Sequence, residues 1–154
     1  MPGGHRSPRL PRCIARDLDA YCTATALVSS GLPTSSFTFK GFPPRKSGQR
    51  CRFLDAERES PHTLVLFESP HRLGALLDDA LAVLGNRLAA VCVELTKMFE
   101  QVDRDHLAAL ADRYRGKQIK GEITVVIAGS NPKFLGVEVE GDRAAGDDGD
   151  AGGP

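Results

Sequence analysis

Two polar clusters directly follow short apolar runs, and their side chains are of the kinds that bind ligands and move protons. The first cluster is Glu68-Ser69-Pro70-His71-Arg72, and the second is Glu94-Leu95-Thr96-Lys97, with Glu100 shortly after it. Free backbone N–H groups at a helix start, with histidine and arginine side chains beside them, bind carboxylates and phosphates. A glutamate, or a lysine whose pKa is lowered, can take a proton from a poorly nucleophilic hydroxyl group. The first cluster is therefore a candidate binding site, and the second a candidate source of a general base.

Each cluster also has an ordinary structural explanation. Ser69 and Pro70 are residue types favoured at the first positions of any helix, and His71 and Arg72 are then simply solvated. The second cluster is explained equally well as a solvated strand exit with a surface lysine–glutamate pair. A hydrolase pair of Ser69 and His71 is not expected, because the sequence has no GxSxG elbow and the spacing does not suit a triad. The residues alone leave binding and plain structure both open.

The elements around the clusters predict a βαβ unit. Thr63–Phe67 and Ala89–Val93 are short and continuously apolar, as expected of strands buried on both faces. Between them, leucines and alanines recur at steps of three and four residues, which predicts a helix that begins with Ser69 as its N-cap and closes at Gly85-Asn86. Ligands in open α/β sheets bind beyond the carboxyl ends of the strands. Both clusters are therefore expected along one ligand-facing edge.

The remaining pattern completes a predicted α/β fold, a mixed sheet flanked by helices. Further helices are predicted over Asp19–Ser30, Gln49–Glu59 and Arg104–Arg115, and further strands around Phe37–Phe39 and over Glu122–Ala128. Residues 1–17 are rich in proline and arginine, and residues 136–154 are rich in glycine and aspartate, so both ends are expected to be disordered. The folded domain is expected to span residues 18–135.

Composition narrows the class of protein. Twenty basic and twenty acidic side chains give a formal net charge of zero, so overall charge does not draw the chain to nucleic acid. The four cysteines and the histidines match no metal-ligand spacing, and no metal site is expected. Free thiols, the lack of a signal-peptide pattern and the lack of a membrane-spanning run predict a soluble cytoplasmic protein.

A local basic segment stands out against this neutral total. Arg45, Lys46, Arg50 and Arg52 follow Phe42 in a proline-bounded loop. The segment is explained either as a solvated linker or as a contact for nucleic-acid phosphates. Phe42 can similarly belong to the core or stack on a base.

Four segments in order carry a family resemblance. They are GLPTSSFTFKGFPPRK, ESPHR, ELTKMFE and KGEITVVIAG, between Gly31 and Gly129. Together they resemble the ribosomal RNA small-subunit methyltransferase I family, which is part of the wider tetrapyrrole-methylase fold. The resemblance implies transfer of a methyl group from S-adenosylmethionine to the 2′-hydroxyl of a cytidine in 16S rRNA. No single segment is specific to the family, but four in order are.

The resemblance also implies roles for residues. It implies that the first cluster and Lys120, Gly121 and Glu122 bind the cofactor S-adenosylmethionine. Without the resemblance, residues 120–122 are explained as a turn before a strand. Glu94, Lys97 and Glu100 are the candidates for the base, and the choice among them stays open. The basic segment becomes a contact for 16S rRNA, and a homodimer is implied as well.

Part of the family pattern has no counterpart in the sequence. The family begins with a domain that holds TPIGNL-like and GxPxxSDPG-like loops, and Leu18–Cys22 stands where it has a PGPSA-like turn. The chain thus resembles the C-terminal half of the enzyme. We expect this half alone to bind S-adenosylmethionine weakly or not at all, and to be inactive. The alternative is a non-catalytic remnant that dimerises or binds RNA through a face left uncovered.

Overall fold

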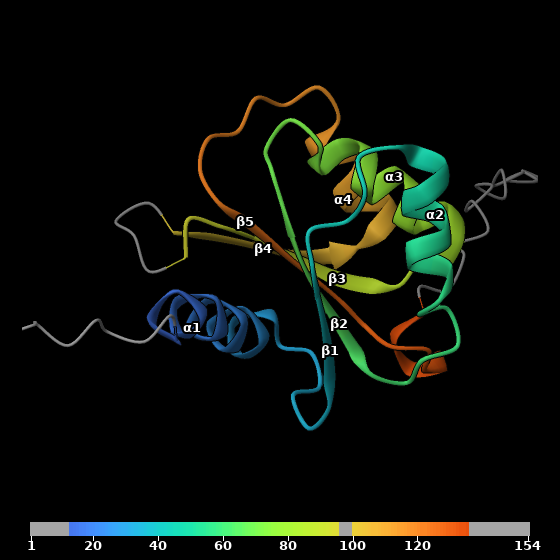
Figure 1. Ribbon diagram of the computed structural model, residues 1–154. Coiled ribbons are helices and arrows are strands. Elements are labelled where there is room, and N and C mark those ends of the chain that lie inside the picture. The colour runs from blue at the N-terminus through green and yellow to red at the C-terminus, as the bar shows by residue number, and fades with distance from the viewer. Residues whose placement is uncertain (1–12, 96–99, 136–154) are drawn as a thin grey trace, which may run out of the picture.

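A computed structural model describes residues 13–95 and 100–135, with side chains from residue 21 onward (Figure 1). The α/β fold that the sequence predicts is confirmed. The elements in chain order are α1 (Cys13–Ser30), β1 (Phe37–Gly41), α2 (Ser47–Asp55), β2 (Thr63–Glu68), α3 (Leu73–Leu84), β3 (Leu88–Val93), β4 (Gln101–His106), α4 (Leu107–Tyr114), β5 (Ile123–Ile127) and a 3-10 helix (Pro132–Phe134).

The five strands form one mixed sheet in the order β1-β2-β5-β3-β4. β1 is parallel to β2, whereas β5 is antiparallel to both β2 and β3, and β4 is antiparallel to β3. β2 and β3 therefore run in the same direction, as the βαβ prediction requires, but β5 lies between them. Glu68 at the end of β2 and Val93 at the end of β3 both pair with Ile123. The two carboxyl ends thus flank the start of β5 along one edge, as predicted.

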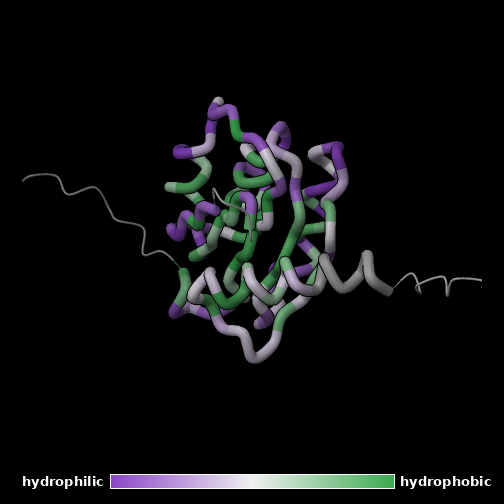
Figure 2. The backbone as a smooth tube through the Cα atoms, turned by 90° about the vertical axis from the view of Figure 1, so that its left-hand side faces the viewer, coloured by the Kyte–Doolittle hydropathy of each residue, from purple (hydrophilic) through white to green (hydrophobic). Residues whose placement is uncertain are grey.

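Helices cover both faces of the sheet, which explains the continuous apolar runs. α2, α3 and α4 lie on one face and α1 lies on the other (Figure 1). Along β5, Val125 and Ile127 belong to the core beneath α3 and α4, and Val126 belongs to the core beneath α1. A strand buried on both sides needs apolar residues at every position. Figure 2 shows the strands as a hydrophobic centre, with hydrophilic residues gathered around the periphery.

The start of α3 differs from the prediction. The helix begins at Leu73 with Arg72 at the N-cap position, and no side chain caps it. Ser69 and Pro70 instead belong to a turn, closed by a hydrogen bond from the Arg72 N–H to the Ser69 carbonyl at 3.0 Å. The Ser69 hydroxyl is engaged by the Arg72 guanidinium, also at 3.0 Å, and so is not used as a helix cap. The prediction that Ser69 and Pro70 open the helix is wrong.

The prediction of one helix over Arg104–Arg115 is also wrong at its start. Residues up to His106 form β4, and α4 covers only Leu107–Tyr114. The other differences concern element ends. α2 lies at Ser47–Asp55 instead of Gln49–Glu59, and α1 begins at Cys13, inside the lead-in that is predicted to be disordered. Residues 1–12 and the predicted tail at 136–154 lie outside the described residues.

Cys92 is fully buried on β3, in the core beneath α1. Burial raises the pKa of its thiol to about 12, and Arg104 opposes the shift while Glu100 adds to it. The unfolded chain releases this proton at a lower pH, near the ordinary value of 9.0. The stability that the protonated thiol contributes is therefore complete below about pH 9, and it is lost as pH rises towards 12.

Raising the pH should accordingly destabilise the chain by up to about 1.4 kcal/mol per pH unit within this window. Cys92→Ala should remove most of that slope between about pH 9 and about pH 10, below the ordinary pKa of tyrosine. Urea unfolding of both proteins across this range measures the slope. Parallel pH curves for the two proteins would contradict the assignment. Cys51→Ala, on α2, is the matched control and should keep the slope.

Candidate functional site

A cavity of about 280 Å³ opens where the ends of β2 and β3 meet the start of β5. Its walls are residues 67–70 from the end of β2, residues 121–124 from the start of β5, and Leu95, Phe42 and Cys22. Glu68, Ser69 and Pro70 of the first cluster thus share one cavity with Gly121 and Glu122. These segments are more than fifty positions apart in the sequence, and the sheet register brings them together.

Glu68 is a buried carboxylate in the wall of this cavity and is only 3% exposed. Its Oε1 accepts a hydrogen bond from the Ser69 N–H at 2.8 Å and pairs with the Arg72 Nε at 3.2 Å. Its Oε2 is also buried and has no hydrogen-bond partner among the described residues. A buried acceptor without a partner costs free energy, and native proteins seldom keep one without a reason. A ligand that donates a hydrogen bond here would satisfy it.

Glu94 and Gly121 are held against each other beside the cavity. Glu94 has φ +53, a left-handed conformation that is uncommon for a residue with a side chain. Its N–H donates to the Glu122 carbonyl at 2.9 Å. Gly121 has φ +103, and a Cβ atom there would overlap the Glu94 carboxyl group. Backbone strain of this kind gathers at ligand sites. Glycine is thus favoured at position 121 by its positive φ, and the Glu94 side chain would have to move aside for any side chain there.

The other predicted site residues lie away from the cavity walls. His71 and Lys120 are exposed, and Arg72 turns back towards Glu68 and Ser69. Glu100 is exposed too. Thr96 and Lys97 lie outside the described residues, so the structure leaves the choice of a base as open as the sequence did.

The basic segment divides into buried and exposed members. Arg50 is only 4% exposed, and its Nε pairs with Asp79 of α3 at 2.7 Å. Its Nη1 donates to the Arg45 carbonyl at 3.2 Å. Arg50 therefore holds the loop in place and is not part of a basic surface, which corrects the prediction for this residue. Arg45, Lys46 and Arg52 are exposed and form no ion pair within the part of the chain that the structure describes.

Removing the Asp79 charge should destabilise the chain strongly. Asp79→Asn leaves the Arg50 cation buried without its counter-charge, and we expect the free energy of unfolding to fall by about 3 kcal/mol. Asp112→Asn is the matched control, because its ion pair with Arg115 is exposed at both ends and should change stability by less than about 1 kcal/mol. Urea unfolding measures both effects. Equal effects of the two substitutions would contradict this account.

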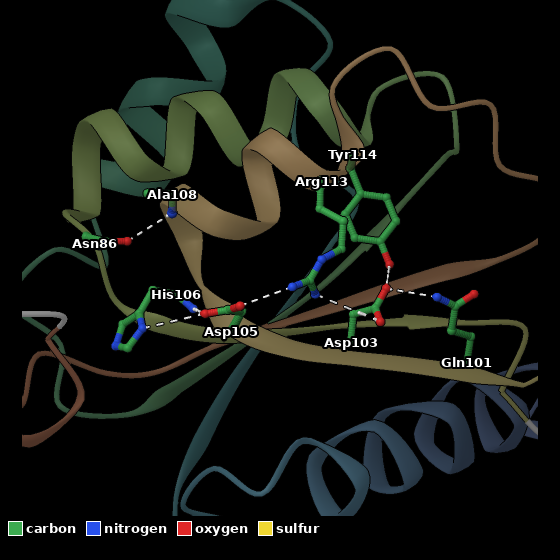
Figure 3. Close-up of polar contacts among 8 residues, drawn as sticks. All are labelled: Asn86, Gln101, Asp103, Asp105, His106, Ala108, Arg113 and Tyr114. Atoms are coloured by element: carbon green, nitrogen blue, oxygen red, sulfur yellow. Dashed lines mark hydrogen bonds and ion pairs between the residues drawn. The ribbon is translucent and has the colours of Figure 1, made fainter.

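A second group of polar side chains joins the edge strand β4 to α4 (Figure 3). The Tyr114 hydroxyl donates to Asp103, which also accepts from Gln101 Nε2 at 3.0 Å. Arg113 pairs with Asp105 at 3.1 Å. Burial and then the hydrogen bond to Asp103 raise the pKa of Tyr114 above its ordinary value, so Tyr114 keeps its proton. None of these residues lines the cavity, and the group is a structural connection that the sequence did not indicate.

Cys22 and Phe67 also line the cavity, although no sequence pattern indicates a site there, and Leu95 lines it as a member of the second cluster. Phe42 was noted beside the basic segment and was not assigned to a pocket. Among the described residues, no group of three or more His, Cys, Asp or Glu side chains could hold a metal ion. Within the same residues, none of the helices has the length and apolar character needed to cross a membrane.

Comparison with known proteins identifies relatives over most of the chain. The ribosomal RNA small subunit methyltransferase I of Mycobacterium tuberculosis is 51% identical over 127 residues, which are 78% of this chain and 44% of that protein. Its counterpart from Halalkalibacterium halodurans is 43% identical over 120 residues, 78% of this chain and 42% of that protein. Over these residues the chain is a homologue of the ribosomal RNA small subunit methyltransferase I family. The chain spans less than half the length of these curated relatives. No protein-family model matches it.

Solved structures share the fold at low sequence identity. The methyltransferase CobJ superposes with a TM-score of 0.52 at 12% identity, over 70% of this chain and 47% of CobJ. The cobalt precorrin-4 methyltransferase CbiF gives a TM-score of 0.51 at 15% identity, over 70% of this chain and 48% of CbiF. These matches confirm the predicted likeness to the tetrapyrrole-methylase fold.

Proposed function

We propose that this chain supplies one half of an S-adenosylmethionine-dependent methyltransferase that modifies the 2′-hydroxyl of a cytidine in 16S rRNA. The observation that carries the proposal is the shared cavity, where Glu68, Ser69 and Pro70 meet Gly121 and Glu122. A concave, mostly apolar pocket with a few polar groups is the usual form of a small-molecule site. The homologous proteins are ribosomal RNA small subunit methyltransferases, and this supplies the reaction class.

The cofactor, when bound, supplies an electrophilic methyl group, and the chain's residues hold and orient the reactants. The proposed cofactor-binding surface consists of Glu68, Ser69 and Pro70 with Gly121 and Glu122, which line the cavity. His71, Arg72 and Lys120 lie just outside its walls. Within this surface, Glu68 Oε2 is the buried acceptor for a donor group of the ligand, and Gly121 forms part of the wall with the Glu94 carboxyl group against it. Alignment of the hydroxyl with the methyl group provides most of the acceleration.

The target hydroxyl must also lose its proton during the transfer. Glu94 is the candidate nearest the cavity in the described residues, because its carboxyl group lies against Gly121. Lys97 and Glu100 remain the alternatives. A carboxylate in this position would accept the proton as the bond to the methyl group forms.

The proposed partner is 16S rRNA in the small ribosomal subunit. Arg45, Lys46 and Arg52 are exposed cations suited to its phosphates, and Arg50 takes no part because it is buried. A homodimer and a cytoplasmic location belong to the same proposal.

A second candidate is a non-catalytic module that dimerises or binds RNA. It is favoured by the exposed rings of Phe37, Phe39 and Phe42, which are 47%, 43% and 62% exposed. Sedimentation at equilibrium distinguishes a dimer from a monomer, and binding to 30S subunits without turnover distinguishes an RNA-binding module from an enzyme.

The test of the proposed function has two arms. The purified chain is mixed with 30S subunits and methyl-labelled S-adenosylmethionine, and its affinity for the cofactor is measured by calorimetry. We expect weak or no binding and no turnover. In the second arm, the chain replaces the matching part of the Mycobacterium tuberculosis relative, and the chimera is expected to methylate 30S subunits. Glu68→Ala in the chimera should abolish transfer, whereas Arg115→Ala, a surface change, should not. A folded chimera without turnover would refute the proposed function.

A further inference from the structure

Three aromatic rings form a surface at the cavity that the cores do not use. The Phe39 and Phe67 rings are 5.0 Å apart, centroid to centroid, in an edge-to-face arrangement, and the Phe42 and Phe67 rings are 5.7 Å apart. Phe42 and Phe67 line the cavity. We call these three rings the aromatic platform. Offset and edge-to-face pairs at these distances are attractive, so the rings hold one another in place.

The platform is exposed despite its apolar character. Phe42 is 62% exposed and Phe39 43% exposed, and neither belongs to the core on either face of the sheet. Phe42 lies between Gly41, which has φ +66, and Pro43, which is buried. Large exposed rings grouped beside a cavity indicate a binding surface.

Positive charge follows directly along the chain. Arg45 and Lys46 come three and four residues after Phe42, and both are exposed and free of ion pairs within the described residues. Arg50 of α2 donates hydrogen bonds to the Arg45 carbonyl and to the Asp79 carboxylate of α3. The loop that carries these cations is therefore anchored to α2 and α3. The chain thus carries exposed rings and, three and four residues after Phe42, exposed cations on an anchored loop.

This combination matches the chemistry of a single-stranded nucleic acid. Unpaired bases stack on aromatic side chains, while neighbouring phosphates bind lysine and arginine. A purely apolar partner would use the rings and leave the cations unmatched.

We propose that Phe42 stacks on an unpaired base of the RNA substrate, with Arg45 and Lys46 on the adjacent phosphates. This inference rests on the proposed function for its choice of RNA. It adds the residue that positions the strand, because a base held on Phe42 keeps its ribose next to the cavity that Glu68 lines.

The experiment measures RNA binding without any methyl transfer. A fluorescein-labelled single-stranded RNA of about 12 nucleotides is titrated with the purified chain, and anisotropy is followed over a range of salt concentrations. Phe42→Ala should weaken binding about 10-fold and leave the salt dependence unchanged. Phe42→Tyr should restore the affinity, because its ring stacks equally well. Val28→Ala, an exposed apolar change on α1, is the matched control and should have no effect.

A double substitution and an altered RNA separate the two contacts. Arg45→Ala with Lys46→Ala should lower the slope of log affinity against log salt by about 1 to 2, because phosphates lose their cations. An RNA with abasic positions should bind the chain and Phe42→Ala with equal affinity.

The proposal is overturned if the chain does not bind the RNA at low salt, or if Phe42→Ala and the unaltered chain bind it equally. A dimer that dissociates on Phe42→Ala without loss of RNA affinity would also overturn it, and would assign the platform to a second copy. Since binding is measured without cofactor or turnover, an inactive chimera leaves this result unaffected.

Discussion

Arg87→Met is expected to lower the free energy of unfolding by about 4 kcal/mol. The Arg87 guanidinium is buried, and it donates to the carbonyls of Leu84 at 2.8 Å, Ala128 at 3.4 Å and Arg58 at 2.5 Å. These carbonyls belong to the end of α3, the residue after β5, and the connection between α2 and β2. Methionine fills similar space but donates to none of them. Two buried contacts and one partly buried contact are therefore lost at once.

Burying the Arg87 charge has a cost that opposes this loss of stability, but that cost is smaller. Burial lowers the pKa of Arg87 from its ordinary value, because the charged form loses hydration. Methionine avoids that cost, but the carbonyls remain without donors. Their lost hydrogen bonds are the larger effect, so the free energy of unfolding falls. Urea unfolding gives the change, with Arg115→Met as the control because Arg115 is 64% exposed and forms only surface ion pairs. A loss below about 1 kcal/mol for Arg87→Met would show that these carbonyls find other partners.

Gly129→Ala is expected to cost about 3 kcal/mol or more, for a steric reason. A Cβ atom at position 129 would overlap the backbone carbonyl of Pro61 and crowd that of His62. Neither segment can easily move apart, because the Ser130 N–H donates to the Ser60 carbonyl at 2.7 Å. The substitution must therefore distort the connection into β2 or the exit from β5.

The matched control for Gly129→Ala is a glycine substitution that is expected to raise stability. Gly74 lies in α3, and a Cβ atom there meets nothing nearer than the Tyr114 carbonyl, at 3.8 Å. Gly74→Ala should stabilise the chain by about 0.5 to 1 kcal/mol, because alanine favours the helix and restricts the unfolded chain. Thermal and urea unfolding of the two variants should move in opposite directions. If Gly129→Ala proves neutral, the close backbone approach is not rigid.

The buried strands and α3 could be predicted because burial on both faces imposes a local pattern. β2, β3 and β5 are apolar at nearly every position, and the leucines of α3 keep a helical period. The position of β5 between β2 and β3 could not be predicted this way. The strands β2 and β3 would have the same apolar runs whether they were direct neighbours or were separated by an antiparallel strand. The runs therefore do not indicate the strand order.

β4 escaped prediction because it is a polar edge strand. Its sequence QVDRDH has half-exposed or exposed residues throughout and pairs only with β3. A strand with few buried residues shows no clear alternation of apolar and polar residues. The predicted helix therefore begins at Arg104, although residues 104–106 belong to β4. The interaction that secures β4, Asp103 with Tyr114, joins residues of two different elements.

The sequence indicates that the ends of β2 and β3 share one edge, because both strands run in the same direction. The meeting of Glu68 with Gly121 follows from the antiparallel insertion of β5 between β2 and β3, which the apolar runs do not indicate. The sequence does not indicate that Arg50 is buried, because its partner Asp79 lies on another helix, 29 positions away. Ser69 was misassigned because Arg72 engages its hydroxyl.

The central place of β5 has a consequence for how the chain is made. Among the described residues β5 is the last strand to be synthesised, yet it fills the middle of the sheet between β2 and β3. Until residues 123–127 leave the ribosome, the inner edges of both strands lack their hydrogen-bonding partner. The sheet must then close through contacts between distant parts of the sequence, which slows folding, and open apolar edges invite aggregation. Folding of this chain is therefore completed after, and not during, synthesis of its other strands.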